Sequence, residues 1–227
     1  TFISGNLVAE GGKTLLDHVQ PLVRNVFHAR PRSTEEFGLR ASQGPANIIA
    51  ATDGQLLTGW VRETPVVIDG HAVSDVERDI LKIAVVNRYR ECAPSVGLIR
   101  GFGLKQGALA SSVAHDSHNI VAVGVSDEDL CTAVNMVIAH RGGLAAAGGS
   151  VRKSIALPIA GLMSDRDGWE VASDYSRLQQ VVREFGSPLK APFLTLSFMA
   201  LLVIPRLKMS DQGLFDAQAF TPVRVFD

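Results

Sequence analysis

Residues 108–130 read ALASSVAHDSHNIVAVGVSDEDL, and this stretch decides the fold class. Residues 108–113 and 120–125 are short apolar segments bounded by polar residues, a pattern typical of strands in a sheet. Ser126 is a favoured helix N-cap, and acidic residues follow it where the positive end of the helix dipole stabilises them. Two strands and an amphipathic helix in direct succession predict an α+β fold.

Similar segments extend on both sides of this stretch. Glycine, proline or polar residues bound further strand-like runs at 48–52, 56–61, 66–68, 80–89, 96–99 and 151–157. Residues 80–89 also fit a helix, but the β-branched run around Ile83 and Val85 favours a buried strand. Helical spacing recurs at 127–141, ended by Gly142, and at 168–185, ended by Gly186. We therefore expect mainly antiparallel β-sheet layers flanked by amphipathic helices.

The first thirty residues differ from the rest of the chain. Turns at Gly5-Asn6 and Gly11-Gly12 predict short strand-turn-strand units, too small to bury their own faces. We interpret residues 1–30 as the tail of a small β domain with a connector, and residues 31–227 as an α+β domain. The chain opens at Thr1 without methionine, which suggests a piece of a longer polypeptide.

Composition excludes several functions. With 22 basic and 23 acidic residues, the 227-residue chain has no basic field for nucleic acid. Its longest apolar run, 193–204, is well below the roughly 20 residues that span a bilayer, so we expect no membrane partner. Two cysteines cannot form a disulfide framework, and no signal peptide is evident, so we expect a cytoplasmic protein with two buried thiols.

The densest set of reactive side chains lies between two of the predicted strands. These candidates are His115, Asp116, Ser117, His118 and Asn119. Polar residues at the end of a strand pair project from a rigid frame and often form sites. Asp, Ser and Asn are also ordinary turn formers, so a purely structural loop is the competing interpretation.

Three specific chemistries are less well supported. His115, His118 and Asp116 are a possible metal set, although the stronger His-Glu-x-x-His zinc motif is absent. A Ser-His-Asp triad is disfavoured because no Gly-x-Ser-x-Gly elbow presents a serine. The glycines between 97 and 107, with Lys105, match neither the dinucleotide nor the Walker pattern, which favours tight turns over phosphate binding.

A family resemblance adds what spacing alone does not supply. Residues 101–121, GFGLKQGALASSVAHDSHNIV, resemble the signature stretch of the adenine deaminase family of the amidohydrolase superfamily. The resemblance continues in ERDILKIAVV (77–86), LPIAGLMSD (157–165), PFLTLSF (192–198) and KMSDQGLFD (208–216). Most of the chain is therefore covered, as the C-terminal domain and the end of the small β domain.

The resemblance implies an enzyme that hydrolyses adenine to hypoxanthine and ammonia at a binuclear manganese or iron centre inside a (β/α)8 barrel. The His-x-His pair that opens such a metal site occurs nowhere in this sequence. The catalytic and metal-binding residues are therefore expected upstream of Thr1, in an N-terminal barrel of the same polypeptide. The resemblance also implies a homodimer.

Within that family, residues 115–119 are expected to be a lid that binds adenine over the barrel mouth. One departure concerns Tyr89, which stands where relatives commonly carry histidine, so Tyr89 is not included among the predicted site residues. The alternative function is a non-catalytic module that binds a purine or stabilises a dimer. The fragment alone is expected to be inactive.

Overall fold

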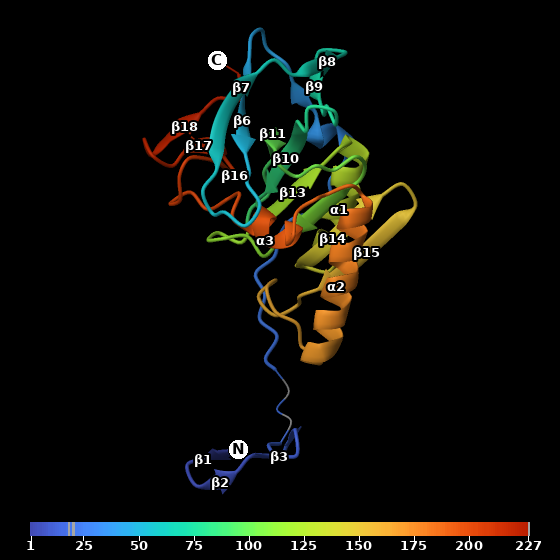
Figure 1. Cartoon of the computed structure of the whole chain (residues 1–227), viewed down its shortest axis with the longest axis vertical. Helices are drawn as coiled ribbons and strands as arrows, with labels where there is room; N and C mark the ends of the chain where they lie inside the picture. Colours follow the sequence, from blue (N-terminus) through green and yellow to red (C-terminus); the bar gives the residue numbers. More distant parts are fainter. Residues whose placement is uncertain (18, 20, 227) are drawn as a thin grey trace.

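An eight-stranded sheet forms the frame of the computed structural model, which describes residues 1–17, 19 and 21–226 (Figure 1). The strand order is β15-β14-β12-β13-β10-β11-β6-β7. Neighbouring strands are antiparallel, except that β11 and β6 run parallel. The strands are β6 (Ala46–Ala50), β7 (Gly59–Glu63), β10 (Leu81–Val86), β11 (Ser95–Arg100), β12 (Ala108–Ser111), β13 (Ile120–Gly124), β14 (Gly143–Gly148) and β15 (Val151–Ala156). The predicted α+β class is confirmed, and the strand predicted within 80–89 is confirmed as the shorter β10.

Helices cover both faces of this sheet. α1 (Asp127–Ala139) packs on β12, β13 and β14, where the sheet presents mainly alanines. These small side chains allow the helix to approach closely, and its predicted stripe from Leu130 to Ile138 is buried there. α2 (Gly168–Glu184) and α3 (Pro192–Ser197) cover the opposite face, against larger side chains such as Ile83 and Val123.

The capping signals of α1 are largely realised. The side chain of Ser126 accepts a hydrogen bond from the Asp129 amide at 3.1 Å. At the other end, the left-handed residue is Arg141 as well as the expected Gly142, with φ of 55° and 122°. Gly142 has a second role, because a Cβ at this position would overlap the backbone of Gly161. The helix end is thereby joined to the turn around residue 160.

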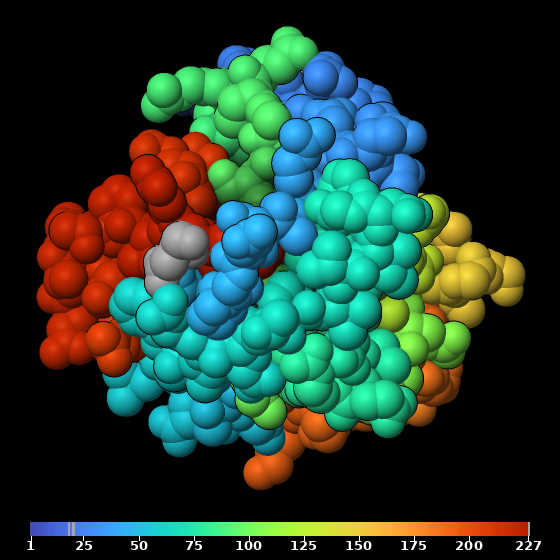
Figure 2. Space-filling model, turned by 90° about the horizontal axis from the view of Figure 1, so that it is seen from above, coloured from blue at the N-terminus to red at the C-terminus, as the bar shows by residue number. Residues whose placement is uncertain are grey.

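Smaller sheets surround the main one. β5 (Leu39–Arg40), β9 (His71–Val73) and β8 (Val66–Ile68) form one, preceded by the 3-10 helix η1 (Thr34–Phe37). β16 (Leu207–Ser210), β17 (Gly213–Asp216) and β18 (Thr221–Val223) form another. Seen from above, the segments around β6 to β9 lie beside the C-terminal strands (Figure 2). The run 193–204 forms α3 and the turns that follow it, and none of the described helices is long and apolar enough to cross a bilayer.

The N-terminal residues form two small hairpins, drawn well below the main sheet in Figure 1. Their strands are β1 (Phe2–Ile3), β2 (Asn6–Leu7), β3 (Ala9–Glu10) and β4 (Lys13–Thr14). The first turn uses Ser4-Gly5, one residue earlier than predicted, and both residues have positive φ. Phe2 and Ile3 are exposed, in agreement with strands too short to bury their own faces.

The connector contacts the larger domain, because Phe27 is buried with the side chains beneath α1. A domain boundary at residue 30 stays a prediction, and His18, Gln20 and Asp227, which fall in the predicted domain ranges, lie outside the described residues. Cys131 is buried as expected, but the expectation for Cys92 was wrong: it is exposed, because the chain leaves the sheet after β10.

Candidate functional site

The segment 112–119 connects β12 to β13 and extends beyond the residues that pair between the two strands. Ser112 anchors its first part, since its fully buried hydroxyl donates to the Gly161 carbonyl at 2.6 Å and accepts from the Gly143 amide at 2.8 Å. Ser112 is therefore occupied by the backbone and is not available as a nucleophile. The loop beyond it starts from a fixed position on the sheet.

Two histidines of this loop come together. The His115 amide donates to the Ser197 carbonyl at 2.9 Å, and its imidazole stacks on Phe198 with ring centroids 5.1 Å apart. The His118 ring meets His115 edge to face at 5.7 Å. The His118 amide donates to the Ala114 carbonyl at 2.7 Å, and its φ is 54°. The predicted loop thus presents a histidine pair supported by the end of α3.

The other three predicted residues are placed differently. Asp116 and Ser117 are exposed at the tip. Asn119 is buried, and its Oδ1 accepts a hydrogen bond from the Arg88 amide at 3.2 Å. Asn119 therefore serves as a structural anchor at the start of β13, which agrees with the interpretation of this residue as a turn former.

His118 is the most unusual group of the loop. Its Nδ1 is buried and finds no hydrogen-bond partner among the residues that the structure describes. Burial lowers the pKa of His118 below its ordinary value of 6.5; the neighbouring His115 and Arg88 lower it further, and Asp116 opposes them. This shift favours the neutral form of the ring at pH 7. A neutral imidazole with an unpaired nitrogen retains hydrogen-bonding capacity for a ligand or for another part of the protein.

Arg88 and Tyr89, which are not among the site residues predicted from the sequence, lie beside the loop. The buried Arg88 donates from Nη2 to the Tyr89 hydroxyl at 2.8 Å, and that hydroxyl donates to the Ser117 carbonyl at 2.8 Å. A signal was present, because Arg88 and Tyr89 follow the apolar run 83–86 with only Asn87 between them. Val86, at the end of β10, pairs with Ile120, at the start of β13. Arg88 and Tyr89 therefore lie at the same end of the sheet as the loop.

The described residues do not form a metal centre. No three histidine, cysteine, aspartate or glutamate side chains among them gather as a metal site requires. The alternative in which His115, His118 and Asp116 share one ion is therefore not supported. Manganese or iron would need donors from outside the described part of this chain.

A pocket of about 260 Å³ adjoins His115. Its walls are mostly apolar and come from β12, β14, the turn after β15, α2 and α3. They include Val113, Leu144, Leu157, Leu162, Tyr175, Phe193 and Leu194. The histidine pair therefore borders an apolar hollow that opens at the surface.

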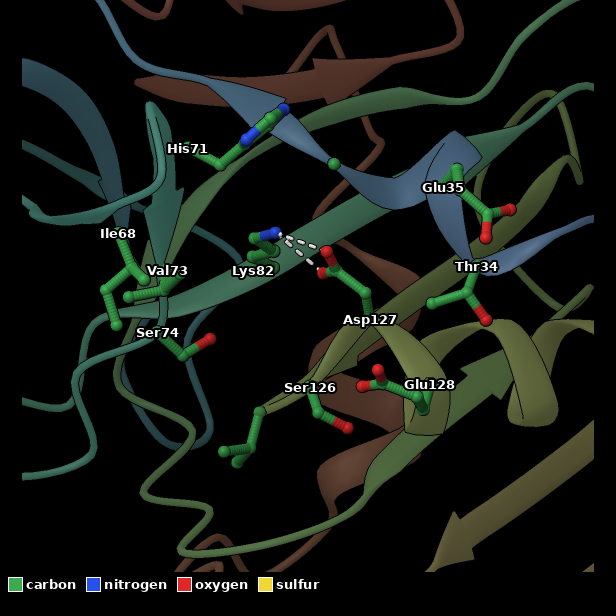
Figure 3. Close-up of a pocket in the computed structure, with 12 residues that line it drawn as sticks. Thr34, Glu35, Ile68, His71, Val73, Ser74, Lys82, Ser126, Asp127 and Glu128 are labelled. Carbon is green, nitrogen blue, oxygen red and sulfur yellow. Dashed lines mark hydrogen bonds and ion pairs between the residues drawn. The ribbon is translucent and has the colours of Figure 1, made fainter.

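A larger pocket of about 650 Å³ lies elsewhere (Figure 3). Figure 3 shows Lys82 and Asp127 pointing toward each other at its floor, with Nζ 2.6 and 2.9 Å from the carboxylate oxygens. Lys82 pairs with Gly124 across β10 and β13, whereas Val86 pairs with Ile120 next to the loop. This pocket is thus near the opposite end of the sheet, and its central charges already neutralise each other.

Comparison with known proteins decides the family. Residues 55–221 match the family described as the adenine deaminase C-terminal domain. This chain belongs to that family. The matched range includes the 115–119 loop, Arg88 and Tyr89, so the residues that form the histidine site all lie inside the adenine deaminase C-terminal domain.

Relatives of this domain extend the match. An adenine deaminase of Salinibacter ruber is 52% identical over 97% of this chain, and one of a Sulfurovum species is 51% identical over 97%. An adenine deaminase of Methanosarcina barkeri is 43% identical over the whole chain. The chain spans only 40–42% of the length of these relatives. The predicted resemblance to an adenine deaminase C-terminal domain is confirmed.

Proposed function

We propose that this chain is the C-terminal part of an adenine deaminase, which hydrolyses adenine to hypoxanthine and ammonia, with the 115–119 loop closing over the active site. Relatives called adenine deaminase match nearly the whole chain and are more than twice as long. Their additional length leaves room for the expected N-terminal barrel. In this proposal, residues 1–30 are the end of a small β domain and the connector, and residues 31–227 are the C-terminal domain.

The observation that carries the role of the loop is the buried Nδ1 of His118, which is unpaired within the described part of the chain. Adenine offers ring nitrogens that accept hydrogen bonds and an exocyclic amine that donates them. A neutral histidine can supply one matching donor or acceptor. Closure of a loop over the substrate also excludes water from the reacting centre. His115, fixed on Phe198, supports His118 in this position.

In this proposal the metal is bound outside the 227 residues of this chain. The described residues hold no three-donor set, so we place the binuclear manganese or iron centre in the N-terminal barrel. Residues 115–119 then contribute binding and orientation of adenine. Accordingly, the 227-residue chain without the barrel is expected to release no ammonia from adenine.

The test uses the full-length parent protein and measures ammonia release from adenine. Replacing His118 by alanine is expected to lower kcat/KM about 10-fold, the effect of losing roughly one hydrogen bond in the transition state. The matched control is His71→Ala, which removes an exposed imidazole beside the pocket of Figure 3. Turnover equal to that of the wild type in both His115→Ala and His118→Ala would falsify the role of the loop.

Two further features concern the whole protein. We propose that it is a homodimer, which light scattering of the full-length protein tests directly. We also propose a cytoplasmic location, and the exposed free thiol of Cys92 is consistent with a reducing compartment. A measured mass equal to that of one chain would refute the proposed homodimer and would leave the proposed role of the loop unchanged.

A further inference from the structure

Arg88 and Tyr89 contact three segments that are far apart in the sequence. Toward the connector, the Arg88 carbonyl accepts from the His28 amide at 2.6 Å, and the Tyr89 carbonyl lies 3.1 Å from His28 Nδ1. Toward the turn around residue 160, Arg88 Nη1 donates to the Ala160 carbonyl at 2.7 Å. The third segment is the 115–119 loop, which these two residues bind at two points.

The loop contacts close a short chain of hydrogen bonds. Arg88 Nη2 donates to the Tyr89 hydroxyl, which donates to the Ser117 carbonyl, each at 2.8 Å. The Arg88 amide donates to Asn119 Oδ1 at 3.2 Å. Since a donor next to a charged group polarises the next bond in the chain, the Tyr89 hydroxyl holds the Ser117 carbonyl more firmly than an isolated tyrosine would. The second half of the loop is thereby attached, at Ser117 and at Asn119, to the residues that follow β10.

The guanidinium itself has little freedom to move. Arg88 is 4% exposed and pairs with no carboxylate among the described residues. Its charge instead faces the rings of Tyr89 and Phe27, with Cζ 4.7 and 5.9 Å from the two centroids. Gly161 packs directly against Nη1, and a Cβ at Gly161 would overlap it. Burying a cation without an anionic partner is costly in free energy, and the hydrogen bonds and ring contacts of Arg88 offset part of that cost.

We propose that Arg88 and Tyr89 are positioning residues, which hold the 115–119 loop and its His118 in the orientation that binds substrate and join that orientation to the connector. The inference rests on the proposed function of the loop. It extends that function, because the connector leads from this domain toward the N-terminal hairpins. A shift of the connector would reach His118 through the Arg88 backbone and the Tyr89 hydroxyl.

The environment of His118 gives a readout that stability alone does not. The groups acting on its titration are Arg88 from the end of β10, and His115 and Asp116 from its own loop. If the loop loses its attachment, His118 becomes better solvated and its pKa rises toward the ordinary value. The acid limb of the pH profile of kcat/KM should then move to higher pH.

The primary experiment is Tyr89→Phe in the full-length protein. This variant keeps the ring beneath Arg88 and removes only the hydroxyl that links Arg88 to Ser117. We expect kcat/KM for adenine to fall about 10-fold and the acid limb to shift upward. The matched control is Ser176→Ala, which also deletes one hydroxyl-to-carbonyl bond, of 2.9 Å to Ala172, on the exposed side of α2. The control is expected to retain the wild-type profile.

A double-variant comparison separates positioning from general stability. If Tyr89 acts through His118, adding Tyr89→Phe to His118→Ala should lower kcat/KM little further, because interacting residues are not additive. Two independent, multiplying losses would overturn the inference, as would an unchanged Tyr89→Phe enzyme beside an impaired His118→Ala enzyme. An unimpaired His118→Ala enzyme would remove the proposed function of the loop, and this inference with it.

A second variant tests the same contact independently of Tyr89. Arg88→Lys keeps the buried positive charge but loses the fork that bonds Ala160 and Tyr89 together. It is expected to reproduce the upward shift of the acid limb seen in Tyr89→Phe. A folded Arg88→Lys enzyme with the wild-type pH profile would contradict the proposal.

Discussion

The imidazole of His115 lies almost parallel to the ring of Phe198, at an interplanar angle of 24° and a centroid distance of 5.1 Å. Phe198 is the residue that ends α3, and the preceding Ser197 carbonyl accepts the His115 amide. The loop between β12 and β13 is therefore held by contacts with the C-terminal end of α3, which is far from the loop in the sequence. This contact joins the candidate site to the cluster of large side chains beneath α2 and α3.

Replacing Phe198 by leucine removes the stacked face but keeps an apolar side chain. An aromatic pair of this kind contributes about 0.5–1.5 kcal/mol beyond its buried area, so adenine turnover in the full-length protein should fall several-fold. Phe220→Leu is the matched control, since Phe220 forms an edge-to-face pair with Phe215 at 5.0 Å in the C-terminal sheet. Equal turnover in the two variants would contradict the link between Phe198 and the site.

The lowered pKa of His118 predicts a pH dependence of stability. Its folded-state pKa lies below the ordinary 6.5, so the unfolded chain binds more protons as the pH falls below that value. The free energy of unfolding contributed by this group should therefore decrease from about pH 6.5 downward. Urea unfolding of wild type and His118→Gln at several pH values measures this. Parallel curves for the two proteins between pH 7 and pH 5 would refute the prediction.

The buried Lys208 predicts a dependence of stability on pH in the alkaline range. It is fully buried, and its Nζ donates to the carbonyls of Leu56 and Phe198 at 2.7 and 3.1 Å. Burial lowers the pKa of Lys208 to about 8 from 10.5. Between these values the unfolded chain binds more protons, so this group should increase the free energy of unfolding as the pH rises. The free energy of unfolding of the wild type, relative to that of Lys208→Met, should increase between pH 8 and pH 10. A difference that stays constant over this range would contradict the prediction.

Gly161 should be intolerant of a side chain. Its φ is 71°, and an added Cβ would overlap the Arg88 guanidinium. Gly161→Ala is expected to lower the free energy of unfolding by about 1–3 kcal/mol, from backbone strain and the displaced arginine. Gly168→Ala is the control, because nothing lies within 4 Å of a Cβ at the start of α2. Chemical denaturation should show no loss in the control, and a loss as large as that of Gly161→Ala would disprove the packing argument.

The two cysteines should differ in reactivity. Cys92 is exposed, whereas Cys131 is buried beside the Arg32 carbonyl, and burial raises the pKa of its thiol. Because the thiolate is the reactive form, a thiol reagent should modify only Cys92 of this pair in the folded protein. Both should react after unfolding. Peptide mapping by mass spectrometry distinguishes the sites, and rapid native labelling of Cys131 would oppose this placement.

Local patterns predicted the elements of the sheet and the two long helices. The apolar runs at 108–113 and 120–125, and the Ser126 cap, depend on neighbours within a few residues, so they can be interpreted from the chain alone. The exposure of Cys92 could not be predicted in this way. It depends on where the chain leaves β10, and the residues after Tyr89 have no periodic pattern that marks this point.

The candidate site was only partly predictable. The loop and its histidines follow from a polar insertion between two apolar strands. The difference between Asn119 and His118 does not, because Asn119 accepts a hydrogen bond from an amide 31 residues earlier, whereas His118 Nδ1 has no partner in residues 1–17, 19 and 21–226. Adjacent residues of similar polarity can thus have different roles, depending on what the rest of the fold places beside them.

The sequence by itself determined the α+β class, the family resemblance and the position of the polar loop, because these depend on residue types and short spacings. The tertiary structure alone brought Arg88 and Tyr89 to that loop, and placed the connector and the turn around residue 160 against the same guanidinium. Ala160 lies 72 residues from Arg88 in the sequence. No local periodicity encodes such contacts, since they arise only when the strands pair and burial forces each polar group to find a partner.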